Sequence, residues 1–265
     1  MIQGNFNILV DYEATSVQPA EARPIEVGLA LVDNELQVVK TFSQPIWEEG
    51  YPALSKEVRD ITGIDPGMLR LEGIPLRDAL ARFGDEISEY LPFVQHFVAY
   101  NREYDETLTK TEALRQPLGL TALGNLMLQL PWVCAMKDIE QNYSKKCWTQ
   151  SHLALDYGIP VDPKQLHTAL GDVLLMREIL VATGADTNEM LEFQREPWVV
   201  VQALVPSPWT DSGKGIALAK KHGYSWEKAK GVEEKFDKSW VKAVKFRNVE
   251  HELKSVPFKA QITKG

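Results

Sequence analysis

The sequence predicts an α/β fold, in which helices cover a mixed sheet and a smaller α+β domain follows. Three observations lead to this prediction. Three apolar, strand-like runs lie close together near the N-terminus. Runs with helical spacing then alternate with single strand-like runs up to about residue 185. The pattern of residues changes around Pro197, after which a run with strong β-strand character begins.

Five short runs are expected to be strands of the first sheet. They are Phe6–Val10, Ile25–Val32, Val38–Phe42, Phe97–Tyr100 and Trp132–Ala135. The first run is apolar apart from Asn7, which is typical of a strand that is covered on both faces. Asp33 and Asn34 supply the turn between the second and third runs, so the first three strands should form a meander.

Helices are expected between and after these strands. Ser55 can cap a short helix that Gly63 would end. From Leu76 to Tyr90 the apolar residues recur at helical spacing, which predicts an amphipathic helix. Further helices, each followed by a glycine or a proline that would stop it, are expected at Arg102–Leu114, Ser151–Tyr157 and Thr168–Thr183.

The chain is expected to contain two domains, residues 1–190 and residues 197–265. The second should be a small α+β domain, with strand-like runs and one lysine-rich helix at Trp198–Val205, Ile216–His222, Val241–Phe246 and Val256–Ile262. Residues 1–185 carry 15 Lys and Arg against 26 Asp and Glu, whereas residues 208–265 carry 13 against 7. Such asymmetry indicates that the basic part faces nucleic acid.

The composition is typical of a cytoplasmic protein. The 265 residues are 44% apolar and 25% charged, with a net charge of −8. Cys134 and Cys147 are too few for a disulfide scaffold and lack the partners of a zinc site. The N-terminus does not resemble a secretory signal, and no run approaches the ~18 apolar residues of a membrane span. We therefore expect no membrane partner.

Two carboxylates follow the first strand-like run. Asp11 and Glu13 are two residues apart, so in a strand both side chains leave the same face. Two like charges placed together are costly unless a cation compensates them. The pair therefore favours a site for a hard divalent cation, which prefers oxygen ligands. The alternative is a polar strand end whose acids are simply solvated.

Two further stretches place acids near strand ends or helix starts. Asp105 lies about one turn into the helix that follows the fourth strand, where ligand sites form in such sheets. His167 precedes the long helix and Asp172 lies inside it. Gly171 costs a helix about 1 kcal/mol, so close packing or ligand access is needed to explain it. Each acid alone could equally be a solvated residue that favours the helix N-terminus.

Taken together and in order, these stretches resemble the DEDDh exonucleases, which include proofreading subunits of DNA polymerases, oligoribonucleases and exodeoxyribonuclease X-like enzymes. The matches run over about residues 5–185: D-x-E-x-T at Asp11, Glu13 and Thr15; N-x-x-x-D at Asn101 and Asp105; and H-x-A-x-x-D at His167, Ala169 and Asp172. The stretches Pro24–Gly28 and Ile61–Ile64 also fit the family.

The resemblance implies a ribonuclease H-like fold with a five-stranded mixed sheet, and a 3′→5′ exonuclease that releases nucleoside 5′-monophosphates. Asp11, Glu13, Asp105 and Asp172 would hold two Mg²⁺ or Mn²⁺ ions, and His167 would act as general base. Thr15, Ile64 and Asn101 would contact the substrate. Single-stranded DNA is the favoured substrate, RNA stays open, and replication or repair proteins are candidate partners. A silent nucleic-acid scaffold and a small-nucleotide phosphodiesterase are the alternatives.

The C-terminal segment contains lysines interleaved with aromatic residues. Its A-K-x-x-G-x-x-W and K-x-W stretches resemble an appended domain of phage and mobile-element replication proteins. Aromatic rings can stack on bases while lysines follow phosphates, so Lys220, Trp226 and Trp240 are candidate nucleic-acid contacts. Tyr224 and the lysines at positions 228, 230, 242 and 245 are expected to contribute to the same surface. The alternative is that the tryptophans form the core of this small domain.

Overall fold

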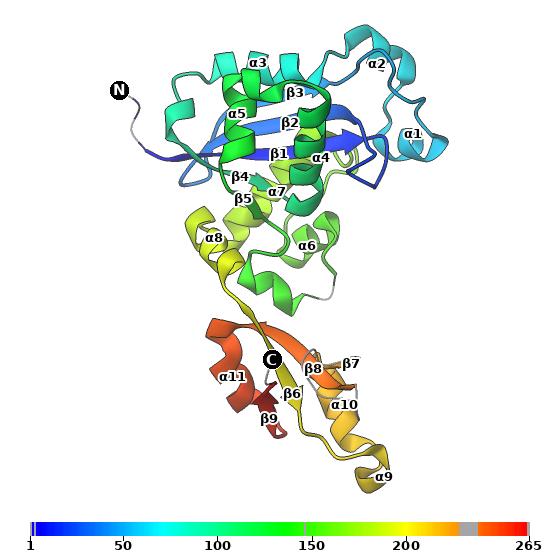
Figure 1. Cartoon of the computed structure of the whole chain (residues 1–265), viewed down its shortest axis with the longest axis vertical. Helices are drawn as coiled ribbons and strands as arrows, with labels where there is room; N and C mark the ends of the chain where they lie inside the picture. Colours follow the sequence, from blue (N-terminus) through cyan, green and yellow to red (C-terminus); the bar gives the residue numbers. More distant parts are fainter. Residues whose placement is uncertain (1, 3, 146, 228–237, 264–265) are drawn as a thin grey trace. The chain divides into compact units, whose positions relative to one another are not determined.

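The computed structural model describes residues 2, 4–145, 147–227 and 238–263. The chain forms two compact units, Met1–Gln194 and Arg195–Gly265, each with its own sheet (Figure 1). Among the described residues, no helix combines the length and apolar character needed to cross a bilayer.

The sheet of the first unit has five strands in the order β3-β2-β1-β4-β5. The strands are β1 (Phe6–Ala14), β2 (Pro24–Asp33), β3 (Val38–Pro45), β4 (Val94–Ala99) and β5 (Trp132–Cys134). β2 pairs antiparallel with both β1 and β3, whereas β4 pairs parallel with β1 and β5. This is the mixed α/β sheet that the sequence predicts.

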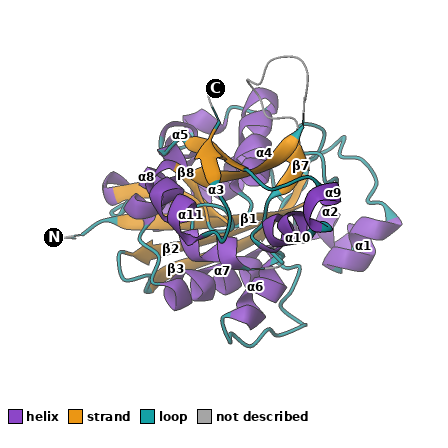
Figure 2. Cartoon of the chain, turned by 90° about the horizontal axis from the view of Figure 1, so that it is seen from below, coloured by secondary structure: helices purple, strands orange, loops and turns teal. Residues whose placement is uncertain are grey.

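Helices cover both faces of this sheet (Figure 1, Figure 2). The helices of this unit are α1 (Lys56–Thr62), α2 (Pro66–Glu72), α3 (Leu76–Glu86), α4 (Arg102–Arg115), α5 (Ala122–Gln129), α6 (Gln150–Asp156), α7 (Ala169–Thr183) and α8 (Thr187–Arg195). Three 3₁₀ turns, η1 (Leu91–Phe93), η2 (Leu118–Leu120) and η3 (Glu140–Ser144), complete the described elements of this part.

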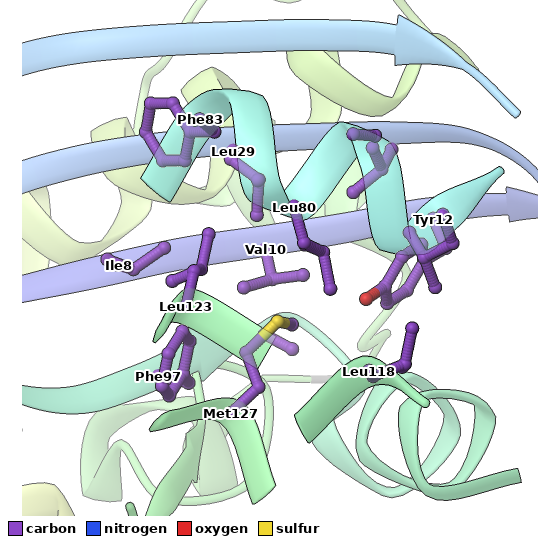
Figure 3. Close-up of a cluster of buried hydrophobic side chains, with 14 of the residues drawn as sticks. Ile8, Val10, Tyr12, Leu29, Leu80, Phe83, Phe97, Leu118, Leu123 and Met127 are labelled. Atoms are coloured by element: carbon purple, nitrogen blue, oxygen red, sulfur yellow. The ribbon is translucent and has the colours of Figure 1, made fainter. Parts of the chain in front are cut away.

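The alternation of side chains along β1 divides the core into two layers. Ile8, Val10 and Tyr12 point to the layer beneath α3, α4 and α5 (Figure 3). Leu9 belongs to the other layer, which α6 and α7 cover. Because residues two apart share a face, Asp11 and Glu13 follow Leu9 to the α7 side of the sheet.

Several predicted helix ends are confirmed and others are wrong. Ser55 caps α1 by accepting the N–H of Val58 at 3.1 Å, and Gly63 ends it at φ 69°. The helix predicted to reach Tyr90 ends at Glu86, where Ile87 at φ −113° leaves helical geometry, and a turn over residues 87–90 leads into η1. Among the described helices of the first unit, α2, α5 and α8 have no predicted counterpart, and all are short.

The second unit has a four-stranded antiparallel sheet in the order β7-β8-β6-β9. Its elements are β6 (Trp198–Ala203), α9 (Pro208–Asp211), α10 (Lys214–Lys221), β7 (Ser225–Glu227), β8 (Ser239–Lys245), η4 (Phe246–Asn248), α11 (Val249–Ser255) and β9 (Ala260–Ile262). The strand predicted to begin at Val256 begins only at Ala260. Pro257 has no N–H to donate to a sheet, and Val256 and Phe258 pack into the core of the unit instead.

Candidate functional site

Asp11 and Glu13 lie in the last part of β1, where the cross-strand register gives each a neighbour on β2. Asp11 is paired with Gly28 and Glu13 with Glu26. Residues directly opposite one another in an antiparallel pair point to the same face. Three carboxylates, those of Asp11, Glu13 and Glu26, therefore stand on the face of the sheet that α7 covers.

Asp105 reaches the same place from α4. It lies in the first turn of that helix and is 3% exposed. The Tyr12 and Thr109 hydroxyls, 3.1 Å apart, tie α4 to β1. The backbone of Tyr12 donates a hydrogen bond to the Asp105 carboxyl, which places this carboxyl beside Asp11 at the end of β1. The charge of Asp105 raises the pKa of Asp11.

The start of α7 brings the remaining two predicted residues to the site. Thr168 caps the helix by accepting the N–H of Gly171 at 3.1 Å, and Asp172 lies in the first turn. His167 precedes the cap, is exposed, and adopts the left-handed conformation at φ 60°. Ligand atoms of Glu13, His167 and Asp172 all lie within 4.8 Å of one another.

Close packing explains the glycine inside α7. A Cβ on Gly171 would lie 2.1 Å from the carbonyl oxygen of Gln165 and 2.5 Å from the Thr168 hydroxyl. The loop that carries His167 therefore folds tightly over the first turn of the helix. Of the two explanations that the sequence left open, the structure supports close packing.

Burial and mutual repulsion both disfavour the ionised form of the carboxyl groups at this site. Burial raises the pKa of Asp11 well above its ordinary range, and the charges of Asp105, Asp172, Glu13 and Glu26 raise it further. Burial, with the charges of Asp172 and Glu26, raises the pKa of Glu13 to about 7. Burial also raises the pKa of Asp172 to about 6, although His167 opposes the shift. Bound divalent cations would relieve this repulsion, and the oxygen-rich donor set suits them.

We therefore expect the metal-free protein to lose stability as the pH rises from about 4 to about 7. In the folded state the Asp172 carboxyl keeps its proton up to a pKa of about 6 and the Glu13 carboxyl up to a pKa of about 7, whereas in the unfolded state both ionise near pH 4, so the folded state is favoured at low pH. At about 1.4 kcal/mol per pKa unit the loss is on the order of a few kcal/mol. Thermal melts in EDTA between pH 4 and pH 8 measure it.

Saturating Mn²⁺ should remove most of this pH dependence, because it replaces the missing positive charge and adds about 2.7 kcal/mol at 100 times Kd. Asp172→Asn is the matched variant, since it keeps the side-chain volume and removes one charge. A slope in EDTA that is as steep in Asp172→Asn as in the wild type would contradict the assignment of the slope to this site.

The three residues predicted to contact the substrate occupy different surroundings. Ile64 lines a cavity of about 230 Å³ together with Glu26, Met68 and Thr168. The hydroxyl of Thr15 accepts the N–H of Arg23 at 2.9 Å, which closes the loop after β1. Asn101 is the N-cap residue of α4 and is exposed, but its side chain makes no capping hydrogen bond. Their contacts with substrate stay predictions.

Two residues at the site were not identified from the sequence. Glu26 stands among the catalytic candidates, and Gln150 of α6 donates to the backbone carbonyl of Asp172 at 2.6 Å. The two-residue spacing of Glu26 and Gly28, which repeats that of Asp11 and Glu13 on the neighbouring strand, was the available signal for Glu26. We find no sequence signal for Gln150.

In the second unit the candidate nucleic-acid contacts divide into exposed and buried groups. Trp226 on β7 is 52% exposed, and its ring centroid lies 5.5 Å from that of Trp240 on β8. The ammonium of Lys220 lies 5.5 Å from the Trp240 ring centroid, and Trp240 packs against the core of the unit. The predicted surface role of Tyr224 and Lys245 is wrong, because they are 3% and 4% exposed.

The remaining lysines of that prediction have other surroundings. Lys242 pairs with Glu252 of α11 at 2.8 Å, so its charge is already neutralised within the unit. Lys228 and Lys230 lie outside the described residues. Lys220 is exposed on α10, and its ammonium lies beside the ring of Trp240, so among the described lysines of this prediction it stays a candidate for a nucleic-acid contact.

Comparison with solved structures establishes the fold. E. coli exonuclease I in complex with a dA16 oligonucleotide is 13% identical and has a TM-score of 0.60 over 96% of this chain and 68% of that one. The nuclease domain of 3′hExo, a DEDDh family member bound to rAMP, is 17% identical, with a TM-score of 0.56 over 67% of this chain and 90% of that one.

A 3′-exonuclease that recognises the histone mRNA stem-loop is 16% identical, with a TM-score of 0.55 over 69% of this chain. The match spans 65% of the length of that protein. No curated protein is similar enough in sequence to count as a match.

A family model described as an exonuclease, RNase T, matches residues 8–180, which is well over half of the chain. The matched span contains all five of the residues Asp11, Glu13, Asp105, His167 and Asp172. The family and the ribonuclease H-like fold that the sequence predicted are thereby confirmed. The chain belongs to the RNase T exonuclease family and is a nuclease of the DEDDh type.

Proposed function

We propose that the protein is a 3′→5′ exonuclease that releases nucleoside 5′-monophosphates from single-stranded DNA with the help of two divalent metal ions. The observation that carries this proposal is the convergence of Asp11, Glu13, Asp105 and Asp172 on one end of the sheet, beside His167. Carboxylates gathered in this way are disfavoured in the absence of cations, so their arrangement is best explained by metal binding.

Asp11, Glu13, Asp105 and Asp172 are the residues that would hold Mg²⁺ or Mn²⁺. When bound, such ions neutralise the charge of the scissile phosphate and make a water molecule more acidic. The carboxylates would determine where the metal ions lie. They stand on three separate elements: β1, α4 and α7. Movement of any one element would therefore disturb the site.

His167 is the proposed general base. It lies within 4.8 Å of Glu13 and Asp172, and its exposed position leaves the ring accessible to a water molecule beside the scissile bond. The imidazole would take the proton of the attacking water, while the bond between phosphorus and the 3′-oxygen of the preceding nucleotide breaks. The 5′-phosphate then leaves with the released nucleotide.

Two observations support nucleic acid as the class of substrate. The similar structures include one protein in complex with a DNA oligonucleotide and another bound to rAMP, so the fold accommodates both chemistries. The basic second unit favours a polymer over a small nucleotide, because an acidic catalytic unit attracts a polyanion weakly on its own. We favour DNA as the substrate.

Digestion of single strands labelled at the 3′ end or the 5′ end, as DNA and as RNA, tests this function. The expected result is immediate release of the 3′ label as a mononucleotide in Mg²⁺ or Mn²⁺, slow shortening of 5′-labelled strands, and no reaction in EDTA. Release of the 5′ label first would refute the polarity. Binding without cleavage would support a silent scaffold, and cleavage of dinucleotides alone would support a small-nucleotide phosphodiesterase.

We further propose that Trp226 stacks on a base of the strand, with Lys220 near the phosphates. Trp226→Ala should weaken binding of single-stranded DNA by about 1–3 kcal/mol, because the substitution removes the exposed ring on which the base would stack. Trp240→Ala should instead lower the melting temperature, because that ring packs against the core of the unit. Fluorescence anisotropy with a labelled strand and thermal melts measure the two effects.

Trp209 supplies a matched control, because it is 94% exposed on α9 and belongs to the same unit. Trp209→Ala should leave both binding and stability close to those of the wild type. Equal loss of affinity in Trp209→Ala and Trp226→Ala would contradict a defined stacking site at Trp226.

A further inference from the structure

Glu26 is a carboxylate that the proposed chemistry does not use. It stands directly opposite Glu13 across the β1–β2 pair, and its charge acts on Asp11, Glu13 and Asp172. Like charges directly opposite each other destabilise a sheet. A third acid on this face therefore needs a compensating interaction of its own.

The hydrogen bonds of Glu26 show what that interaction is. Its Oε2 accepts the backbone N–H of Ala169 at 3.1 Å, and its Oε1 accepts the hydroxyl of Ser43 on β3 at 2.8 Å. Ala169 is the first residue of α7, so its N–H has no partner within the helix. A negative charge at a helix N-terminus is also favoured by the helix dipole.

Gly28, two residues after Glu26 on β2, makes a second contact with the same turn of α7. A Cβ on Gly28 would lie 2.3 Å from the carbonyl carbon of Ala169 and 2.5 Å from the nitrogen of Leu170. The backbone of β2 therefore touches the backbone of α7 at this point. Only glycine allows this approach, because any larger residue would displace the helix or the strand.

These two contacts connect the two halves of the site. Gly28 and Glu26 are the cross-strand partners of Asp11 and Glu13, and both touch the start of the helix that carries Asp172. The distance between the carboxylates of β1 and the first turn of α7 is thus set through β2. His167 immediately precedes the Thr168 cap and is two residues from Ala169, so the same contacts anchor the chain next to it.

We propose that Glu26 is a positioning residue, which together with Gly28 docks the first turn of α7 on β2 and holds His167 and Asp172 opposite Asp11 and Glu13. The proposal rests on the function assigned above. Each oxygen of Glu26 accepts a hydrogen bond from a protein donor, so the role proposed for it is exerted through Ala169 and Ser43. Small displacements of reacting groups are costly, at up to about 100-fold for about 1 Å.

The test compares Glu26→Ala with Glu26→Gln in the full-length protein. Glutamine can still accept the Ala169 N–H and can donate to the Ser43 hydroxyl, whereas alanine loses both hydrogen bonds. We expect Glu26→Ala to lower kcat on a single-stranded oligonucleotide by about 10- to 100-fold with little change in KM, and to weaken Mn²⁺ binding by a similar factor. Glu26→Gln should restore most of both quantities.

Asp186→Ala is the matched control for stability. Asp186 accepts the N–H groups of Asn188 and Glu189 in the first turn of α8, so its loss removes a helix-capping carboxylate away from the site. We expect Asp186→Ala to lower the melting temperature about as much as Glu26→Ala while kcat and Mn²⁺ affinity stay unchanged.

Three results would overturn the positioning role: full kcat in Glu26→Ala, no rescue by Glu26→Gln, or equal loss of kcat in Asp186→Ala. Isothermal titration of Mn²⁺ without substrate separates this proposal from the function on which it rests. If the wild type cleaves none of the labelled strands, the nuclease assignment fails. Weaker Mn²⁺ binding in Glu26→Ala, restored in Glu26→Gln, would still support the docking of α7 by Glu26.

Discussion

Replacing Asp11 or Asp172 with alanine is expected to abolish nuclease activity while the fold stays intact. Either change removes a carboxylate from the group proposed to hold the metal ions. Metal ions contribute several kcal/mol to the stabilisation of a phosphoryl transition state, so the expected loss is about 10³-fold or more in kcat/KM. Turnover with saturating Mn²⁺ measures it, and activity near that of the wild type would contradict the carboxylate assignment.

The same variants should behave unusually in thermal melts without metal. Removing Asp172 relieves repulsion with Asp11 and Glu13, so the melting temperature in EDTA should stay the same or rise. Asp78→Ala is the matched control, because Asp78 also lies in the first turn of a helix, α3. Its removal sacrifices a favourable helix-dipole interaction without relieving a carboxylate cluster, so it should slightly lower the melting temperature.

Local spacing predicted the two halves of the site but not the contact between them. The two-residue separation of Asp11 and Glu13 places both on one face of a strand, and this follows from backbone geometry alone. The pairing of Glu13 with Glu26 depends on the register of β1 against β2. Hydrophobic alternation determines which residues face the core, but a shift of the register by two residues would leave that pattern unchanged. For this reason Glu26 was overlooked, although its spacing from Gly28 was visible.

Glycines and prolines illustrate a second limit of prediction from sequence. The sequence showed that Gly171 is costly within a helix. The carbonyl of Gln165, which fills the space that a side chain at position 171 would need, belongs to a loop without a periodic sequence pattern. In the second unit the alternation from Val256 to Ile262 favoured a strand, and Pro257 confined that strand to its last three residues.

Tyr224 was expected on the surface, yet it packs edge-on against Phe258 in the core.

His167→Ala is expected to lower kcat by about 10²- to 10⁴-fold while Mn²⁺ binding survives, as for the loss of a general base. Because a base must be unprotonated to act, the wild-type rate in saturating Mn²⁺ should rise with pH on the acidic side. That part of the rise should be absent from the variant. Rates over a pH series and Mn²⁺ titrations of both proteins are the measurements.

The backbone at His167 requires a second variant before the loss is assigned to chemistry. Its φ of 60° disfavours alanine, so His167→Ala could also shift the loop that leads into α7. Asparagine tolerates this conformation better than other residues with side chains and offers no base, so His167→Asn should preserve the loop and lose as much activity. Recovery of activity in His167→Asn would show that loop geometry, rather than proton transfer, was lost. A fall in Mn²⁺ affinity in both variants would make His167 a metal ligand, in line with its position within 4.8 Å of the ligand atoms of Glu13 and Asp172.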